Sequence, residues 1–224
     1  MVKNILNLEM IDREIQYFDD PFRYAVIDNF FSEKDLEFVT AKLDFLEQNR
    51  KFRNDTEQRK KNVKKQLHNY EKTPDERYAK YFQLINSLDI KQDKEKDYTS
   101  EYAYFYRARK EVEDNPVHTE NIYRAISLTV YMGKEKNYGT LLYDENKNFV
   151  KEIEWKYNRA FVMAGFNNQK GKLPGISTWH TYKTKPDTIR KTFFGYTVSG
   201  KESILNHSLY KEYKNFWLIK NMVS

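Results

Sequence analysis

The chain of 224 residues contains no cysteine, and this absence excludes several kinds of chemistry at once. Without a thiol the protein can form no disulfide, hold no iron–sulfur cluster or thiolate zinc site, and use no cysteine nucleophile. Any metal must therefore be held by nitrogen and oxygen ligands, and four histidines are available for that purpose. These are His68, His118, His180 and His207.

Long apolar stretches are absent as well. No uninterrupted run approaches the roughly 18 to 20 residues that a bilayer span needs. The opening residues, MVKNILNLEMIDRE, have neither an apolar core of signal-peptide length nor a small-residue cleavage site. We therefore expect a protein without a membrane segment that remains in the cytoplasm.

An excess of one charge sign is confined to a single segment. The formal net charge is +6, and residues 48–72 alone carry nine Lys or Arg against three Asp or Glu, so the rest of the chain sums to zero. Because this segment has few apolar side chains, it is typical of a solvated helix or an insertion. An exposed charged surface is the favoured interpretation, ahead of an arm that binds anions.

Aromatic residues, by contrast, are abundant. The chain has 18 Tyr, 15 Phe and 3 Trp, which is enough to fill the core of one domain of this length. Residues 24–30 predict a strand, and Ser32 with Asp35 predicts the start of a helix. Apolar residues at helical spacing continue that helix and indicate a second one, so we assign residues 32–88 to a helical N-terminal part.

Beyond residue 98 the hydrophobic period changes. Short alternating segments broken by turn residues predict seven strands, which favours a sandwich or a barrel. The segments are Tyr98–Ala108, Tyr123–Met132, Gly139–Tyr143, Phe149–Trp155, Arg159–Phe166, Ile176–Tyr182 and Arg190–Val198. With an amphipathic helix expected over 203–222, the sequence predicts one domain spanning 1–224, of α+β class with a mainly β core at 98–199.

One candidate metal-binding pair lies just before the second of these strands. His118 and Glu120 are two residues apart, so on an extended backbone both side chains point to one face. With four histidines and 33 acidic residues, such a pair is expected by chance about as often as not, so its context must supply the specificity. His180 follows 62 residues later, and two histidines with one carboxylate on one face of a metal leave three positions open.

A candidate anion-binding face accompanies this pair. Residues 126–131 alternate, so that one side is apolar while the other carries the hydroxyls of Ser127, Thr129 and Tyr131. Arg190 and Thr192, which are two residues apart, likewise share a face of a later strand. A guanidinium beside a hydroxyl is well shaped to hold a carboxylate.

Seven segments in this order carry a family resemblance. They are Tyr24–Ser32, His118–Asn121, Ile126–Met132, Gly139–Leu142, Asn158–Phe166, Trp179–His180 and Arg190–Thr192. Together they resemble the Fe(II)- and 2-oxoglutarate-dependent dioxygenases, most closely the prolyl-4-hydroxylase-like branch. The resemblance covers roughly the last half of the chain and its opening. It implies a distorted double-stranded β-helix of the jelly-roll or cupin type, with the N-terminal helices and a C-terminal helix packed on it.

The resemblance also implies roles for individual residues. The iron ligands would be His118, Glu120 and His180. The distal carboxylate of 2-oxoglutarate would be bound by Arg190, with Thr192 and Tyr131 assisting, and Tyr106 is a weaker candidate for the pocket wall. The chain departs from the family pattern at Glu120, where Asp is usual, and at Gly139, where two glycines are usual.

The implied reaction is hydroxylation of a C–H bond in a peptide or protein side chain, with succinate and CO2 as co-products. The implied cofactors and partners are Fe(II), 2-oxoglutarate and O2, and ascorbate stays open as an auxiliary reductant. The substrate itself is not encoded in any readable motif, so a peptide, a nucleic acid or a small molecule all remain open.

Each candidate residue also has an alternative interpretation. Glu120 could be an exposed partner of Arg124, His180 a buried hydrogen-bonded ring, and Arg190 part of a charged pair with Lys191. If these alternatives hold, the chain is a non-catalytic β-barrel binding module, whose basic segment 48–72 contacts nucleic acid or an acidic partner.

Overall fold

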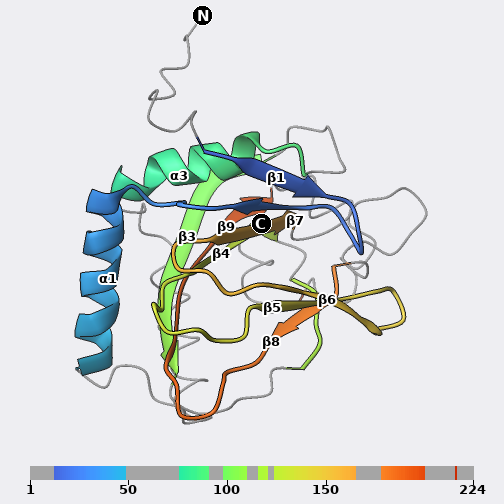
Figure 1. Cartoon of the computed structure of the whole chain (residues 1–224). Coiled ribbons are helices and arrows are strands. Elements are labelled where there is room, and N and C mark those ends of the chain that lie inside the picture. The colour runs from blue at the N-terminus through green and yellow to red at the C-terminus, as the bar shows by residue number, and fades with distance from the viewer. Residues whose placement is uncertain are drawn as a thin grey trace, which may run out of the picture.

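The computed structural model describes residues 13–48, 76–90, 98–109, 116–120, 124–164, 178–199 and 215. This part of the chain contains nine strands and two helices (Figure 1). Most of the basic segment 48–72 and of the predicted helix 203–222 lies outside the described residues. Neither of the two described helices is long and apolar enough to cross a membrane.

Six strands form the larger sheet, in which every neighbouring pair is antiparallel. In spatial order they are β1 (Ile15–Phe18), β2 (Tyr24–Ile27), β7 (Ala160–Ala164), β4 (Arg124–Tyr131), β9 (Arg190–Ser199) and β3 (Tyr98–Arg109). The smaller, three-stranded sheet is also antiparallel and has the order β6 (Phe149–Ile153), β5 (Thr140–Tyr143) and β8 (His180–Tyr182).

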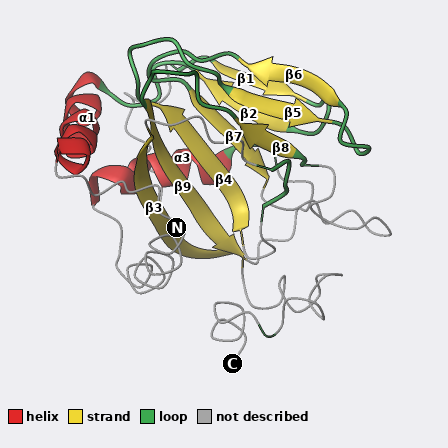
Figure 2. Ribbon diagram, turned by 90° about the horizontal axis from the view of Figure 1, so that it is seen from below, coloured by secondary structure: helices red, strands yellow, loops and turns green. Residues whose placement is uncertain are grey.

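Both described helices lie against the larger sheet. They are α1 (Glu33–Gln48) and α3 (Glu76–Ser87). Figures 1 and 2 show them on the side of the molecule away from β5, β6 and β8. In their apolar stripes, Val39 of α1 and Phe82 of α3 are fully buried. They pack against residues of β2, β4 and β7 that point toward the helices. This packing buries the side of each helix that its 3.6-residue period makes apolar.

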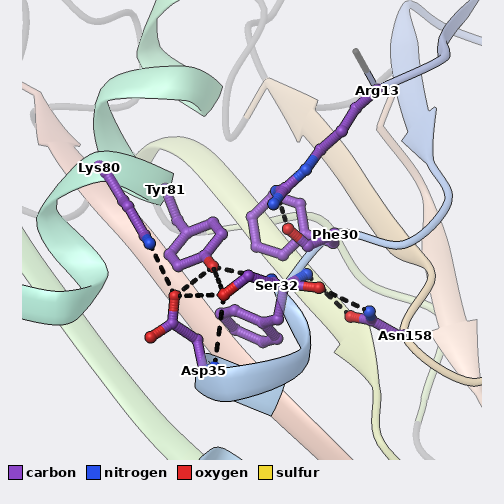
Figure 3. Close-up of polar contacts among 8 residues, drawn as sticks. Arg13, Phe30, Ser32, Asp35, Lys80, Tyr81 and Asn158 are labelled. Carbon is purple, nitrogen blue, oxygen red and sulfur yellow. Dashed lines mark hydrogen bonds and ion pairs between the residues drawn. The ribbon is translucent and has the colours of Figure 1, made fainter. Parts of the chain in front are cut away.

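The start of α1 is fixed by a network of polar side chains (Figure 3). Ser32 accepts a hydrogen bond from the backbone N–H of Asp35 at 3.4 Å, as an N-cap residue does. Asp35 in turn accepts hydrogen bonds from the hydroxyls of Ser32 and Tyr81, at 2.8 and 2.6 Å. Lys80 completes the network with an ion pair of 2.8 Å to the same carboxylate oxygen. The predicted helix start is therefore confirmed, and α3 supplies its remaining partners.

The strands of the larger sheet divide their residues between two faces. Ile126, Leu128 and Val130 of β4 point to the helices and are fully buried. Tyr131, on the alternate parity, packs instead with Leu142 of β5 and other residues between the two sheets. The alternation predicted for residues 126–131 is therefore confirmed, and its second face looks into the space between the sheets.

The smaller sheet depends on a close approach at Gly139. A Cβ atom at this position would lie 1.6 Å from the carbonyl oxygen of Ile153, which no side chain can tolerate. Its backbone N–H donates to the carboxylate of Glu152 at 2.6 Å. The single glycine before β5 is therefore required by the backbone of β6 passing beside it.

The seven strands predicted beyond residue 98 all form, as does the strand predicted over 24–30, although most are shorter than predicted. The structure adds β1, which the sequence did not indicate because it has four residues and none is fully buried. Two antiparallel sheets with helices on one face confirm the α+β class with a mainly β core.

Candidate active site

The fold brings His118 and His180 side by side. The N–H of His118 donates to the carbonyl of His180 at 3.0 Å, and the N–H of His180 donates back to the carbonyl of His118 at 2.9 Å. The two imidazole rings lie with their centroids 4.5 Å apart. Two residues separated by 62 positions in the sequence are thus joined by a reciprocal backbone bridge, the pattern of an antiparallel pair.

Each imidazole is oriented by a carbonyl two residues before it. Nδ1 of His118 lies 2.8 Å from the carbonyl oxygen of Pro116, and Nδ1 of His180 lies 2.8 Å from that of Thr178. Because a carbonyl oxygen can only accept, each Nδ1 is placed as the donor, and the Nε2 atom of each ring points away from that carbonyl. This is the arrangement that prepares a histidine to bind a metal through Nε2.

The charge state of His180 also suits a ligand. Burial, opposed by the carboxylate of Glu120 and aided by the nearby His118, lowers the pKa of His180 to about 4. The imidazole is therefore neutral near pH 7. A neutral ring is the form that binds a metal, because the protonated ring has no free lone pair.

Glu120 lies beside the pair and is buried, with 4% of its side chain exposed. One carboxylate oxygen, Oε1, is 3.8 Å from Nε2 of His180, and the other, Oε2, accepts a hydrogen bond from Nη1 of Arg124. Burial raises the pKa of Glu120, but the positive charge of Arg124 and the two imidazoles outweigh it, so the pKa falls below its ordinary value. The carboxylate is ionised in this setting.

The ion pair between Glu120 and Arg124 corrects one alternative interpretation. The pair does form, yet it is not exposed, because 14% of the Arg124 side chain and 4% of the Glu120 side chain reach solvent. The guanidinium of Arg124 lies over the rings of Phe194 and Tyr196, at 5.1 and 4.6 Å from their centroids. Arg124 is therefore a fixed part of the candidate site.

Arg190 is 5% exposed and is surrounded by aromatic rings. Its guanidinium carbon lies 4.8 Å from the ring centroid of Tyr182, 5.1 Å from Trp155 and 5.8 Å from Tyr131. Tyr182 follows His180 by two residues in β8, so the two share a face of the smaller sheet. Arg190 is therefore held next to the strand that carries His180.

Two other residues predicted to hold a carboxylate, Tyr131 and Thr192, lie on neighbouring strands of the larger sheet. Tyr131 and Thr192 are paired across β4 and β9 and share the face between the sheets. The hydroxyl of Tyr131 donates to Oγ1 of Thr140 and accepts from its backbone N–H, both at 2.9 Å. In the ladder between β3 and β9, Tyr106 pairs with Phe193, the residue after Thr192. The roles assigned to these residues stay predictions.

The donor set fits Fe(II), since two imidazoles and one carboxylate are the ligands of the open facial site that non-haem iron uses. Among the described residues, no three His, Asp or Glu side chains already stand as a metal-holding group. The gap between Nε2 of His180 and Oε1 of Glu120, 3.8 Å, exceeds the roughly 3 Å expected between neighbouring ligands about 2.1 Å from one metal. The ligand assignment therefore stays a prediction.

Sequence reasoning missed two residues of this region, Tyr182 and Trp155, and misjudged the exposure of a third, Arg124. Tyr182 could have been found, because strand alternation places it on the face of His180. Trp155 gave no signal, since it lies beyond the end of β6 and reaches Arg190 only through tertiary packing. Arg124 was noticed as a partner of Glu120, but its burial depends on the rings of β9.

Comparisons with known proteins bear on the fold. No family model matches the chain, and no curated protein does. Among solved structures, a prolyl-4-hydroxylase from Pseudomonas putida matches with a TM-score of 0.50 and 11% identity, over 79% of this chain and 88% of that one. A prolyl 4-hydroxylase from Phytophthora capsici matches with a TM-score of 0.50 and 14% identity, over 90% of this chain and 69% of that one.

Identities this low establish similarity of fold and not of activity. The two matches nevertheless extend over most of the chain. The chain therefore has the fold of the prolyl-4-hydroxylases, and the resemblance to that branch that the sequence predicts is confirmed.

Proposed function

We propose that this protein is an Fe(II)- and 2-oxoglutarate-dependent dioxygenase that hydroxylates a C–H bond of a peptide or protein side chain, on a core that forms a distorted double-stranded β-helix. One observation carries the proposal. The reciprocal backbone bridge sets the imidazoles of His118 and His180 side by side, with the buried carboxylate of Glu120 at their edge. Two histidines and one carboxylate are the protein ligands that this class of iron site requires.

In this proposal the metal is held by Nε2 of His118, Nε2 of His180 and Oε1 of Glu120. The hydrogen bonds from each Nδ1 to a backbone carbonyl prevent the rings from turning over, so both Nε2 atoms remain available. The low pKa of His180 removes the proton that would otherwise compete with the metal near pH 7.

Arg190 is the proposed partner of the distal carboxylate of 2-oxoglutarate. Two residues of extended strand, about 7 Å, separate His180 from Tyr182, and the guanidinium of Arg190 lies against Tyr182. The rings of Tyr131 and Trp155 shield the guanidinium from water, which strengthens its pairing with an anion.

Fe(II) and 2-oxoglutarate, bound together with O2, would supply the oxidising chemistry, and succinate and CO2 would leave as co-products. The chain's own part is to orient these groups and to keep water away from them. The apolar cluster between the sheets, which includes Leu142, Phe161 and Met163, serves the second purpose, since its members are all buried. A peptide or protein substrate is supported by the fold shared with prolyl hydroxylases.

Anaerobic titration of the full chain with Fe(II) and then 2-oxoglutarate tests the proposal. We expect a weak visible charge-transfer band, which His180→Ala abolishes and which the matched control His68→Ala leaves intact. Succinate release, assayed against pools of proline-containing peptides, single-stranded nucleic acids and small metabolites, then identifies the substrate class. A wild-type protein that binds neither Fe(II) nor 2-oxoglutarate would refute the proposal and favour a non-catalytic binding module.

A further inference from the structure

We infer that Arg124 is the positioning residue of the metal site: by holding Oε2 of Glu120, it leaves Oε1 as the single oxygen offered to the metal beside His180. The inference deepens the proposed function and depends on it. It assigns a task to a residue that does not itself touch the metal, and it explains how a glutamate can stand where the related enzymes usually have an aspartate.

The two oxygens of Glu120 have different surroundings. Oε2 is bonded to Nη1 of Arg124, while Oε1 faces Nε2 of His180 at 3.8 Å. Both partners of the ion pair are largely excluded from solvent. Away from water an ion pair with a direct hydrogen bond has a defined geometry, because few water molecules are available to replace either partner.

Arg124 is itself held in place by aromatic rings of the neighbouring strand. It is the first residue of β4, and its guanidinium lies over the rings of Phe194 and Tyr196 on the neighbouring strand β9. These rings face the same side of the sheet as Thr129 and Ser127, with which they are paired across the two strands. A planar guanidinium stacked on two rings presents its N–H groups in a fixed direction, which a flexible lysine could not do as well.

A glutamate ligand needs such a constraint more than an aspartate does. Its side chain has one more rotatable bond, and ordering it costs more conformational entropy. A free glutamate could also bind a metal through both oxygens, which would fill one of the three positions that 2-oxoglutarate and O2 require. The hydrogen bond from Arg124 to Oε2 opposes both effects, since it fixes the side chain and occupies the second oxygen.

Arg124 also places a positive charge near a site for a cation. The repulsion between the two charges lowers metal affinity, whereas positioning of Glu120 raises it. If repulsion dominated, removing the charge would tighten metal binding. If positioning dominates, as we infer, removing the hydrogen bond weakens it, and hydrogen-bonded groups behind a ligand typically change metal affinity by about 10- to 100-fold. The direction of the change therefore separates the two effects.

The experiment measures Co(II) binding to the full-length protein, because Co(II) has a visible spectrum that reports its ligands. We expect Arg124→Met to weaken Co(II) binding by about tenfold or more and to alter the Co(II) spectrum, and Arg124→Lys to recover part of the loss. Arg159→Met is the matched control. It removes a comparably shielded arginine, whose pair with Asp28 measures 2.6 Å, and it should leave Co(II) affinity at the wild-type value.

The outcomes are distinguishable. A wild-type protein that does not bind Co(II) overturns both the proposed function and this inference. A wild type that binds, with Arg124→Met binding equally well or more tightly, overturns the inference alone. Should Arg124→Met fail to fold, as judged by circular dichroism of the metal-free protein, Phe194→Leu decides the question. That change removes one ring beneath Arg124, and it should weaken Co(II) binding severalfold if positioning matters.

Discussion

Asp35 and Glu120 are both buried carboxylates paired with a cation, yet they are used differently. At Asp35 the same oxygen receives hydrogen bonds from Ser32 and Tyr81 and an ion pair from Lys80 (Figure 3). At Glu120 the cation holds one oxygen, and the other faces an imidazole without a hydrogen bond to it. The first carboxylate is bound only by donors that stabilise the fold, whereas the second keeps an oxygen directed at a candidate ligand.

Charge does not distinguish the two positions. Burial raises the pKa of each carboxyl, and in each case the surrounding cation and hydrogen bonds outweigh burial, so both pKa values lie below the ordinary range. What differs is the neighbouring groups, which at Asp35 are all donors and at Glu120 include the imidazoles of His118 and His180. A lowered pKa therefore marks a functional carboxylate only when such neighbours accompany it.

The largest expected effect comes from Glu120→Gln. The amide keeps the shape of the side chain and can still accept a hydrogen bond from Arg124, but it removes the charged ligand, so Co(II) affinity should fall by about 100-fold or more. Isothermal titration measures the loss, and circular dichroism of the metal-free protein confirms that the variant is folded. Retention of full affinity would place the metal elsewhere.

A second substitution tests whether Arg190 binds 2-oxoglutarate at the site that contains Glu120. Arg190→Met should lower the affinity for 2-oxoglutarate by about 30-fold while leaving Co(II) affinity unchanged, because the pair it would form with a carboxylate is shielded by aromatic rings. Titration of the Co(II)-loaded protein with 2-oxoglutarate provides the measurement. An equal loss of metal and 2-oxoglutarate binding would indicate general unfolding of the site.

Asp35→Asn is the counterpart of the glutamate change. An amide in place of the carboxylate presents N–H groups to a cluster of donors, so the free energy of unfolding should fall by about 2 kcal/mol, with Co(II) affinity unaffected. Urea denaturation followed by circular dichroism gives the value. If metal affinity dropped as well, the contrast between the two carboxylates would fail.

The smallest expected effect is on the stability of the protein at low pH. Because the folded-state pKa of Asp35 is lowered, its ionised form adds stability above the unfolded-state value of about 4, and this contribution is lost as pH falls through the folded-state pKa. The unfolding free energy of the wild type should therefore decline more steeply below pH 5 than that of Asp35→Asn. Parallel pH profiles for the two proteins would contradict this assignment.

The sequence predicted what depends on local pattern. Ser32 and Asp35 marked the start of α1 because capping residues act within one turn, and alternation placed His118 and Glu120 on one face. Tyr81 could not be foreseen as a partner of Asp35, because it comes from a second helix, 46 positions away. The bridge between His118 and His180 is likewise set by strand pairing, which spacing alone does not determine.

The surroundings of Arg190 could not be predicted from the sequence for the same reason. From the sequence, the role of Arg190 was inferred from Thr192 on the same strand. In the structure, the guanidinium of Arg190 lies against Tyr182, Trp155 and Tyr131, which come from separate segments of the chain. Packing between sheets is decided by tertiary contacts that no single segment encodes. The strands could be predicted from sequence, but not the arrangement of the rings between the sheets.

If the proposed metal binds at His118 and His180, the reciprocal bridge between them makes local opening and metal binding one linked equilibrium. Exchange of either backbone amide hydrogen with solvent requires the bridge to part, and parting separates the two imidazoles. An ion that binds only the closed arrangement stabilises it by about 2.7 kcal/mol at a hundredfold excess over its dissociation constant. Deuterium uptake at these two amides should then slow by about two orders of magnitude, so the backbone itself reports occupancy of the site.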